Sequence, residues 1–328
     1  MIDGNNEQDR QIVPAGRMPG AKPPSATQGI VWVVIGGFVS SYLPYLGIFL
    51  LAYGMRELLE ANGFRGLVAG LAASAGVCIA ACFIDLSFAL SLISTVVCAA
   101  GICAFMWRKQ ASVTAISLVI CVSALVSLGI DAASAAVSGV SITDIVTEVL
   151  EESAQAALGS DIQANLMISQ IMPILQTIWP FVYVLTAMVD ALIAGIASYA
   201  MSVRCTGVAS TPKIANFDAP LWCVGALAIC ILGLGVSFAG IPGAEVVRTV
   251  CGTCLISLRF VFMIQGFGVV SALTSKKRMG CVTRFLITFA TVWLEVMCFA
   301  MCIIGLIDIW ANFRKLARDG SGSTEAKQ

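Results

Sequence analysis

Three charged residues occupy long apolar segments at positions that a bilayer would hold near its centre. They are Arg259, Asp190 and Glu295, in residues 246–272, 179–203 and 282–307 respectively. About 20 apolar residues span the hydrocarbon core of a bilayer. A guanidinium at mid-depth costs about 3 kcal/mol unless it faces protein or water. One arginine and two acids at one depth therefore predict a polar centre shared by three helices.

Three interpretations of this centre remain open. An ion pair with Arg259 fixes the register of the helices, and the second acid stays neutral. Alternatively, Arg259 binds an anionic group of a solute through paired N–H donors, while Asp190 or Glu295 orients or releases the solute. The third interpretation is proton coupling. Gln265 is a further candidate ligand-binding residue, because a buried amide needs hydrogen-bond partners.

The composition is that of an integral membrane protein. Of 328 residues, 59% are hydrophobic and 12% are charged, whereas soluble domains carry about 25% charged residues. We expect an all-α bundle of about eight transmembrane helices, multi-pass in the cell membrane, with the lipid bilayer as its surroundings. The formal net charge is zero, so no nucleic-acid partner is expected.

Catalytic chemistry is poorly supported by the sequence. Histidine is absent, which removes the usual general base and the commonest metal ligand. No metalloprotease, nucleophile-elbow or nucleotide-loop motif occurs. Most of the thirteen cysteines lie in apolar runs, where they pack as small apolar residues; for Cys251 and Cys254, redox or metal chemistry is the alternative. We therefore expect that the protein is not an enzyme and has no catalytic residue, metal or cofactor.

The chain divides into a polar tail (1–28), a membrane domain (29–312) and a second polar tail (313–328). Within the domain, residues 131–177 contain acids but no Lys or Arg. Ser141 begins a capping-box variant, and the apolar spacing behind it predicts an amphipathic helix. This extracytoplasmic segment is either a connector or a lid.

Two local features have more than one interpretation. Pro44 interrupts the apolar segment 29–55, which is either one kinked span or a re-entrant pair. Asp308 and Arg314 are too far apart for the favoured helical pairing, so we expect a solvated helix end, or partners elsewhere.

Basic residues indicate the orientation of the chain. Loops at 56–65, 108–109, 204–213 and 276–278 carry Lys and Arg, which places them on the cytoplasmic side. The side on which the two termini lie stays open.

The final third carries three short motifs that resemble a known family. They are FDAPLW at 217–222, FMIQGFGVV at 262–270, and IGLIDIW at 304–310 followed by Phe313-Arg314. The chain resembles the YybS-like family of uncharacterised bacterial membrane proteins, a domain of unknown function similar in fold to the S components of energy-coupling-factor transporters. The matching positions, with no role implied, are Pro220, Gln265, Gly266, Gly305, Asp308 and Arg314.

The resemblance implies solute recognition or transport by an S-component-like subunit. Because the chain has no nucleotide loop, ATPase or energy-coupling subunits are the expected partners, together with an unknown small solute. The alternative is a non-transporting membrane scaffold or assembly factor. A solute-binding protein predicts a polar cavity beside Arg259, whereas a scaffold predicts that side chains fill this space.

Overall fold

A computed structural model describes residues 22–110, 112–158, 162–206, 214–239, 242–276 and 280–314. These residues form twelve α-helices and one 3-10 helix, and no strand occurs among them. The predicted all-α fold with several membrane-spanning helices is therefore confirmed. Most of the two predicted polar tails lies outside the described residues.

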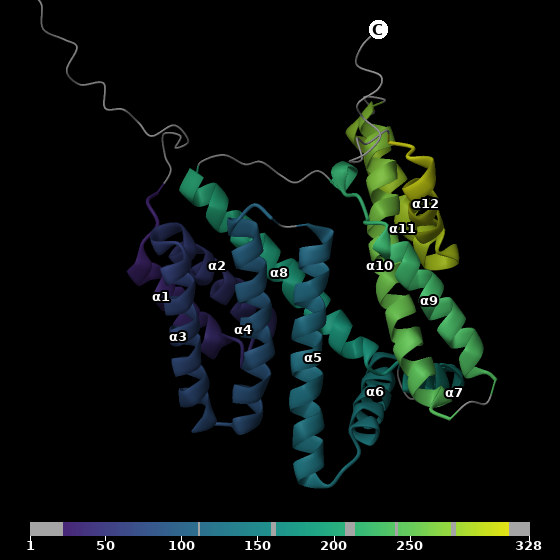
Figure 1. The fold of residues 1–328 in the computed structure, drawn as a ribbon, viewed down its shortest axis with the longest axis horizontal. Helices are drawn as coiled ribbons and strands as arrows, with labels where there is room; N and C mark the ends of the chain where they lie inside the picture. Colours follow the sequence, from purple (N-terminus) through teal and green to yellow (C-terminus); the bar gives the residue numbers. More distant parts are fainter. Residues whose placement is uncertain are drawn as a thin grey trace, which may run out of the picture. The chain divides into compact units, whose positions relative to one another are not determined.

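The chain forms two compact units, whose helices are labelled in Figure 1. The first comprises Met1–Val126 and Ala187–Thr211, and the second comprises Ser127–Thr186 and Pro212–Gln328. Two of the unit boundaries fall within long helices, α5 (Val113–Ser138) and α8 (Phe181–Thr206).

The first unit begins with a closely packed helical hairpin, α1 (Ala26–Val39) and α2 (Pro44–Asn62). A Cβ atom at Gly36 would meet the Leu51 backbone, and one at Gly54 would meet the backbone of α1. Small residues thus let the two backbones approach closely. The segment 29–55 is therefore a pair of helices and not one kinked span.

Pro44 does not bend a helix, which rules out the first of the two alternatives, the kinked span. It lies in the first turn of α2, where the missing N–H of proline breaks no helical hydrogen bond. Helix α1 has 14 residues and is about 21 Å long, shorter than the hydrocarbon core of about 30 Å. Two helices in place of one agree with the re-entrant alternative, and the position of the hairpin in the membrane stays a prediction.

Two further helices pack on this hairpin, α3 (Phe64–Cys82) and α4 (Leu86–Trp107). The Cα of Gly66 lies against the Leu58 backbone of α2, leaving no room for a side chain. The carboxylate of Asp85 caps α4, accepting hydrogen bonds from the Ser87 N–H at 2.9 Å and hydroxyl at 2.8 Å.

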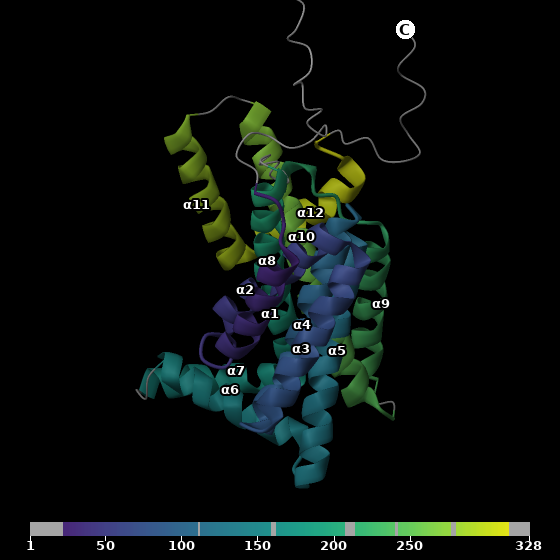
Figure 2. The same ribbon diagram turned by 90° about the vertical axis from the view of Figure 1, so that its left-hand side faces the viewer.

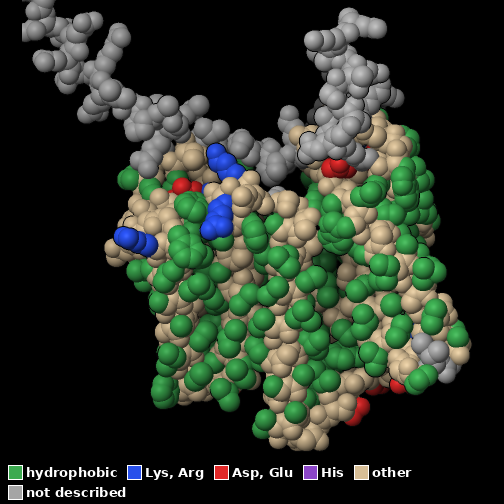
Figure 3. All heavy atoms as spheres, viewed as in Figure 1, with side chains coloured by type: hydrophobic (Ala, Val, Ile, Leu, Met, Phe, Trp, Pro, Cys, Tyr) green, Lys and Arg blue, Asp and Glu red, His purple; other side chains and the backbone are tan. Residues whose placement is uncertain are grey.

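Charged residues gather at one end of the first unit, beside an otherwise largely hydrophobic face (Figure 3). The Ser25 N–H donates to the buried carboxylate of Glu57 at 3.2 Å, and the Arg204 guanidinium lies 3.7 Å from the same oxygen. Gly63 faces the Trp107 ring, so α2 and α4 end on the same side. Exposed basic residues at this end are Arg65, Arg108 and Lys109.

The second unit is arranged around its longest helix, α10 (Ala244–Lys276). Packed against it are the 3-10 helix η1 (Ile214–Asn216), α9 (Trp222–Ser237) and α12 (Ala300–Ala311). Phe262 of α10 is 1% exposed and belongs to the apolar core of these helices. This helix carries Arg259 and Gln265 of the candidate site.

The acidic segment forms two helices, α6 (Ile142–Leu158) and α7 (Ile162–Thr177), while its first residues extend α5. As predicted, an amphipathic helix begins directly after Ser141. Its acids are exposed, and half-buried residues recur on another face of the helix. The acids are Asp144, Glu148, Glu151 and Glu152; the half-buried residues include Ile142, Val146 and Leu150. Its extracytoplasmic position stays a prediction.

The last predicted span is broken. Helix α11 (Cys281–Cys298) ends at Phe299, and α12 leaves at an angle of 99°. Figure 2 shows the V-shaped arrangement of the two helices. A single straight helix over this stretch is therefore wrong, because Phe299 adopts a left-handed backbone conformation with φ 55°.

Five described helices are long and apolar enough to cross a membrane, or six if the bent α11–α12 pair counts as one. Two further predicted spans correspond to shorter apolar helices, α1 and α9. The sequence therefore locates the eight apolar segments, but not every segment is a full-length straight helix.

Candidate functional site

Arg259 and Glu295 form an ion pair between α10 and α11. The Nε and Nη2 atoms of Arg259 lie 3.4 and 3.2 Å from Oε1 of Glu295. The Glu295 side chain is 5% exposed, whereas that of Arg259 is 36% exposed. The carboxylate is therefore enclosed, and part of the guanidinium remains accessible.

The second carboxylate oxygen of Glu295 holds the start of α12. Oε2 accepts hydrogen bonds from the N–H groups of Met301 at 2.9 Å and Cys302 at 3.2 Å. These N–H groups lack helical acceptors because α12 begins at Ala300. Irregular backbone at membrane depth needs such internal partners, and a negative charge also suits a helix N-terminus.

Phe299 lies at the break itself. A bulky residue with positive φ is a backbone outlier and costs about 1–3 kcal/mol. Its ring lies under the guanidinium of Arg259, with 3.8 Å between Cζ and the ring centroid. This cation–π contact and the carboxylate of Glu295 hold the strained turn beside the arginine.

Arg259 retains donor capacity. Its Nε and Nη2 atoms donate to Glu295 Oε1, whereas its Nη1 atom has no acceptor among the described residues. A guanidinium with an accessible edge can bind a carboxylate or phosphate through two parallel hydrogen bonds. The ion pair is thus suited to ligand recognition as well as to fixing the helices.

Asp190 was expected at the same centre. It is half-buried on α8 and belongs to the first unit, where Cys98 of α4 lies close enough to feel its charge. The structure brings Arg259 and Glu295 together, and the predicted contact of Asp190 with Arg259 stays a prediction.

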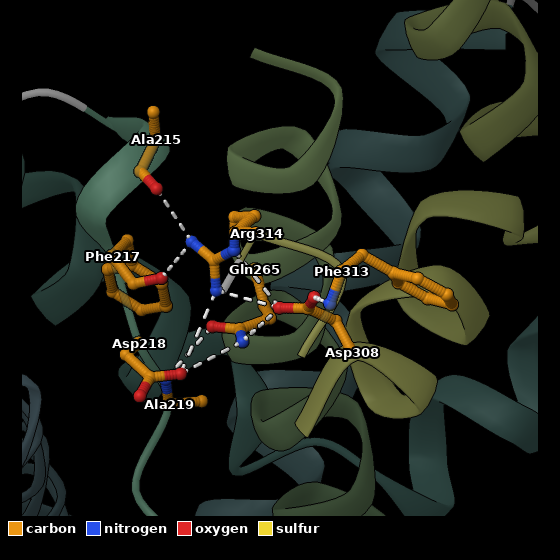
Figure 4. A network of polar contacts seen from close by, with 8 residues as sticks. All are labelled: Ala215, Phe217, Asp218, Ala219, Gln265, Asp308, Phe313 and Arg314. Atoms are coloured by element: carbon orange, nitrogen blue, oxygen red, sulfur yellow. Dashed lines mark hydrogen bonds and ion pairs between the residues drawn. The ribbon is translucent and has the colours of Figure 1, made fainter. Parts of the chain in front are cut away.

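Gln265 lies in a second polar network, six residues after Arg259 on α10, whose members Gln265, Asp308 and Arg314 are buried. Its side chain is buried, and its oxygen accepts the Ala219 N–H at 2.9 Å. Its NH₂ group donates to Asp308 at 2.9 Å and to Asp218 at 3.3 Å (Figure 4). The amide thus ties the segment before α9 to α12.

Arg314 completes this network and is not part of a solvated helix end. Its guanidinium bonds Asp308 at 2.8 Å and donates to the backbone oxygens of Ala215 at 2.9 Å and Phe217 at 2.5 Å. The exposures of the Arg314 and Asp308 side chains are 1% and 0%. The expected solvated end is therefore wrong, because Asn312 turns the chain back with φ 43°.

Glycines in the same motifs let the backbones meet. The carbonyls of Met301 and Phe262 occupy the space where side chains at Gly266 and Gly305 would lie, so α10 and α12 touch. Gly268 leaves room for the Ile214 carbonyl and the Arg314 guanidinium. Close helix contact is thus the role of these glycines.

Asp218 was not predicted from its chemistry, although it lies in the first quoted motif. Its carboxylate is 3.7 Å from Arg314. Asn312 was also missed; asparagine directly after a helix is a recognised signal for a left-handed cap. Together these two residues explain how motifs far apart in the sequence form one network.

Cys230, Cys251 and Cys254 lie close together among the described residues. No group of three or more His, Cys, Asp or Glu side chains is placed to hold a metal there. The Cys251 thiol packs against Gly233 of α9, and Cys251 and Cys254 are free thiols.

Residues 30–309 match the family described as predicted membrane protein (DUF2232). The match includes Arg259, Glu295, Gln265 and Asp308, and it ends before Arg314. No curated protein and no solved structure matches the chain.

Proposed function

The chain belongs to the DUF2232 family of predicted membrane proteins, and we propose that it recognises a small solute at Arg259 and Glu295. The observation that supports this most directly is the ion pair at the α11–α12 break. Transporters commonly place solute sites where discontinuous helices meet near the centre of the membrane. Here an accessible arginine, a buried acid and a strained turn occur together at such a break.

The Gln265 and Arg314 network has a different role in this proposal. All its members are held by partners within the protein, so it anchors α12 against α10 and leaves Arg259 to meet the solute. Removing Gln265 would then weaken the fold more than it changes solute preference.

Transport would require further subunits in the cell membrane. The chain has no nucleotide-binding loop, so an ATPase and an energy-coupling subunit would supply the energy, as the S-component resemblance implies. Co-purification of an ATPase with the full-length protein from its native membrane supports this part of the proposal.

The rival function is a non-transporting scaffold or assembly factor. It is favoured if every solute leaves the protein unaffected and a stable membrane-protein partner binds through the acidic helices α6 and α7. Binding, and not catalysis, is proposed in either case.

Ligand-dependent thermal stabilisation of the purified full-length protein tests the solute site. A library of small metabolites is screened against the wild type, Arg259→Lys and Arg108→Lys. Lysine keeps the charge but loses the paired donors of arginine. We expect stabilisation of the wild type and Arg108→Lys, and at least a tenfold weaker effect in Arg259→Lys. Equal stabilisation of all three proteins contradicts the proposal.

A further inference from the structure

We propose that the solute is a zwitterion, with a carboxylate that binds Arg259 and an ammonium group that binds Glu295. This inference rests on the proposed function, and it names the class of solute. The simplest members of the class are free α-amino acids, whose two charges are separated by a single carbon atom.

Charge balance is the first argument. The charges of Arg259 and Glu295 cancel, and the two groups lie in a part of the chain that is apolar enough to lie in a membrane. An added unpaired charge would carry a desolvation penalty of several kcal/mol. A zwitterion adds no net charge, and each of its ends finds an opposite partner.

The atoms of the pair permit this exchange. Among the residues that the structure describes, Nη1 of the guanidinium has no hydrogen-bond acceptor, and Oε1 of Glu295 has only the moderate hydrogen bonds at 3.2 and 3.4 Å to release. Oε2 can keep the Met301 and Cys302 N–H groups throughout. The solute therefore replaces the contact between Arg259 and Glu295 without removing the cap of α12.

A singly charged solute fits less well. A simple anion would compete with Glu295 for one guanidinium and leave two negative charges together. A simple cation would meet the guanidinium at short range, and the face of Phe299 is already covered by Arg259. Both cases bring like charges together in a medium of low dielectric constant.

Matched derivatives of amino acids test the inference. The full-length protein is titrated with free L-amino acids bearing aliphatic, aromatic and polar side chains, and with the N-acetyl and carboxamide derivative of each. The N-acetyl form keeps only the negative charge, and the carboxamide keeps only the positive one. We expect at least one free amino acid to stabilise the protein, with at least tenfold weaker binding of both derivatives.

Glu295→Gln gives a second prediction that a fold defect cannot mimic. Glutamine preserves an oxygen for the start of α12 but leaves Arg259 without an opposing charge. The N-acetyl derivative should then bind at least as tightly as the free amino acid, reversing the wild-type preference. Arg108→Gln, an exposed residue of the first unit, is the control and should preserve the wild-type order.

The failures of the two proposals are distinguishable. The zwitterion is wrong if a derivative binds the wild type as tightly as its parent, or if no amino acid binds. Solute recognition at Arg259 survives either result if another compound stabilises the wild type but not Arg259→Lys. It fails as well if no compound shows that dependence on Arg259.

Discussion

Arg314 shows how much a single buried side chain contributes to the second unit. From the turn after α12, its guanidinium bonds the carboxylate of Asp308 on α12 and the backbone oxygens at and just after the 3-10 helix η1. It therefore joins three segments of the chain. Removing one partner of a buried ion pair leaves an uncompensated charge. Arg259 differs because its guanidinium is partly accessible. At this scale, burial separates the anchoring arginine from the one proposed to bind a solute.

Arg314→Gln should lower the free energy of unfolding by about 3–5 kcal/mol, because Asp308 then stays buried without its cation. The measurement is unfolding of the purified protein in mixed micelles. Arg108→Gln, at an exposed position, should change it by less than about 0.5 kcal/mol. Similar values for the two variants would show that the network does not hold the unit together.

Asp85 provides a pH-dependent prediction outside the membrane-spanning helices. Hydrogen bonds from the Ser87 side chain and N–H lower the pKa of its carboxyl group. The carboxylate therefore stabilises the fold at neutral pH, and this contribution disappears as the pH falls through the lowered pKa. Asp85→Asn should be less stable than the wild type at pH 7, and the difference should vanish in acid. A constant difference would contradict this.

At the scale of elements, close helix contacts and breaks define the second unit. Helix α12 is held against α10 by two glycines, and Glu295 satisfies the backbone where α11 ends. The turn at Phe299 places its aromatic ring against the Arg259 guanidinium. The site is thus built where the break between α11 and α12 meets α10.

Gly266→Ala should weaken the contact between α10 and α12 by about 1–3 kcal/mol, because the new methyl group would overlap the Met301 backbone. Gly225→Ala is the matched control on α9, where nothing lies within 4 Å of an added Cβ. Thermal unfolding should separate the two variants by several degrees. Equal transition temperatures would contradict the close packing.

The sequence reveals the apolar segments but not their breaks. Hydropathy identifies α3, α4, α5, α8 and α10, which are long and apolar enough to cross a membrane. It does not identify Phe299, because phenylalanine carries no preference for a left-handed turn. The Arg259–Glu295 pair could be predicted from the scarcity of charges in spans, whereas the Arg314–Asp308 pair depends on the turn at Asn312.

For the whole molecule, the α1–α2 and α11–α12 pairs bear on a question that the sequence leaves open, namely on which side of the membrane the two termini lie. Ser25, just before α1, bonds to Glu57 near the end of α2, so the chain enters at the basic end of the first unit. Arg314 lies beside Gly268, in the C-terminal third of α10. Each of the α1–α2 and α11–α12 pairs thus begins and ends at one end of its own unit.

Both termini should therefore lie in the cytoplasm, together with the basic loops. Reporter domains that are active on only one side of the membrane, fused to either end, measure this directly. We expect both fusions to report the cytoplasm, and a fusion between α6 and α7 to report the opposite side. Termini on different sides would show that one of the two pairs crosses the membrane.

The most direct measurement compares solute affinity in the wild type and in Arg259→Lys, with Arg108→Lys as the control. A solute that stabilises the wild type should bind the control equally and Arg259→Lys at least tenfold more weakly. Undiminished affinity in Arg259→Lys, with the protein still folded, would contradict recognition of the solute by the paired donors of this arginine.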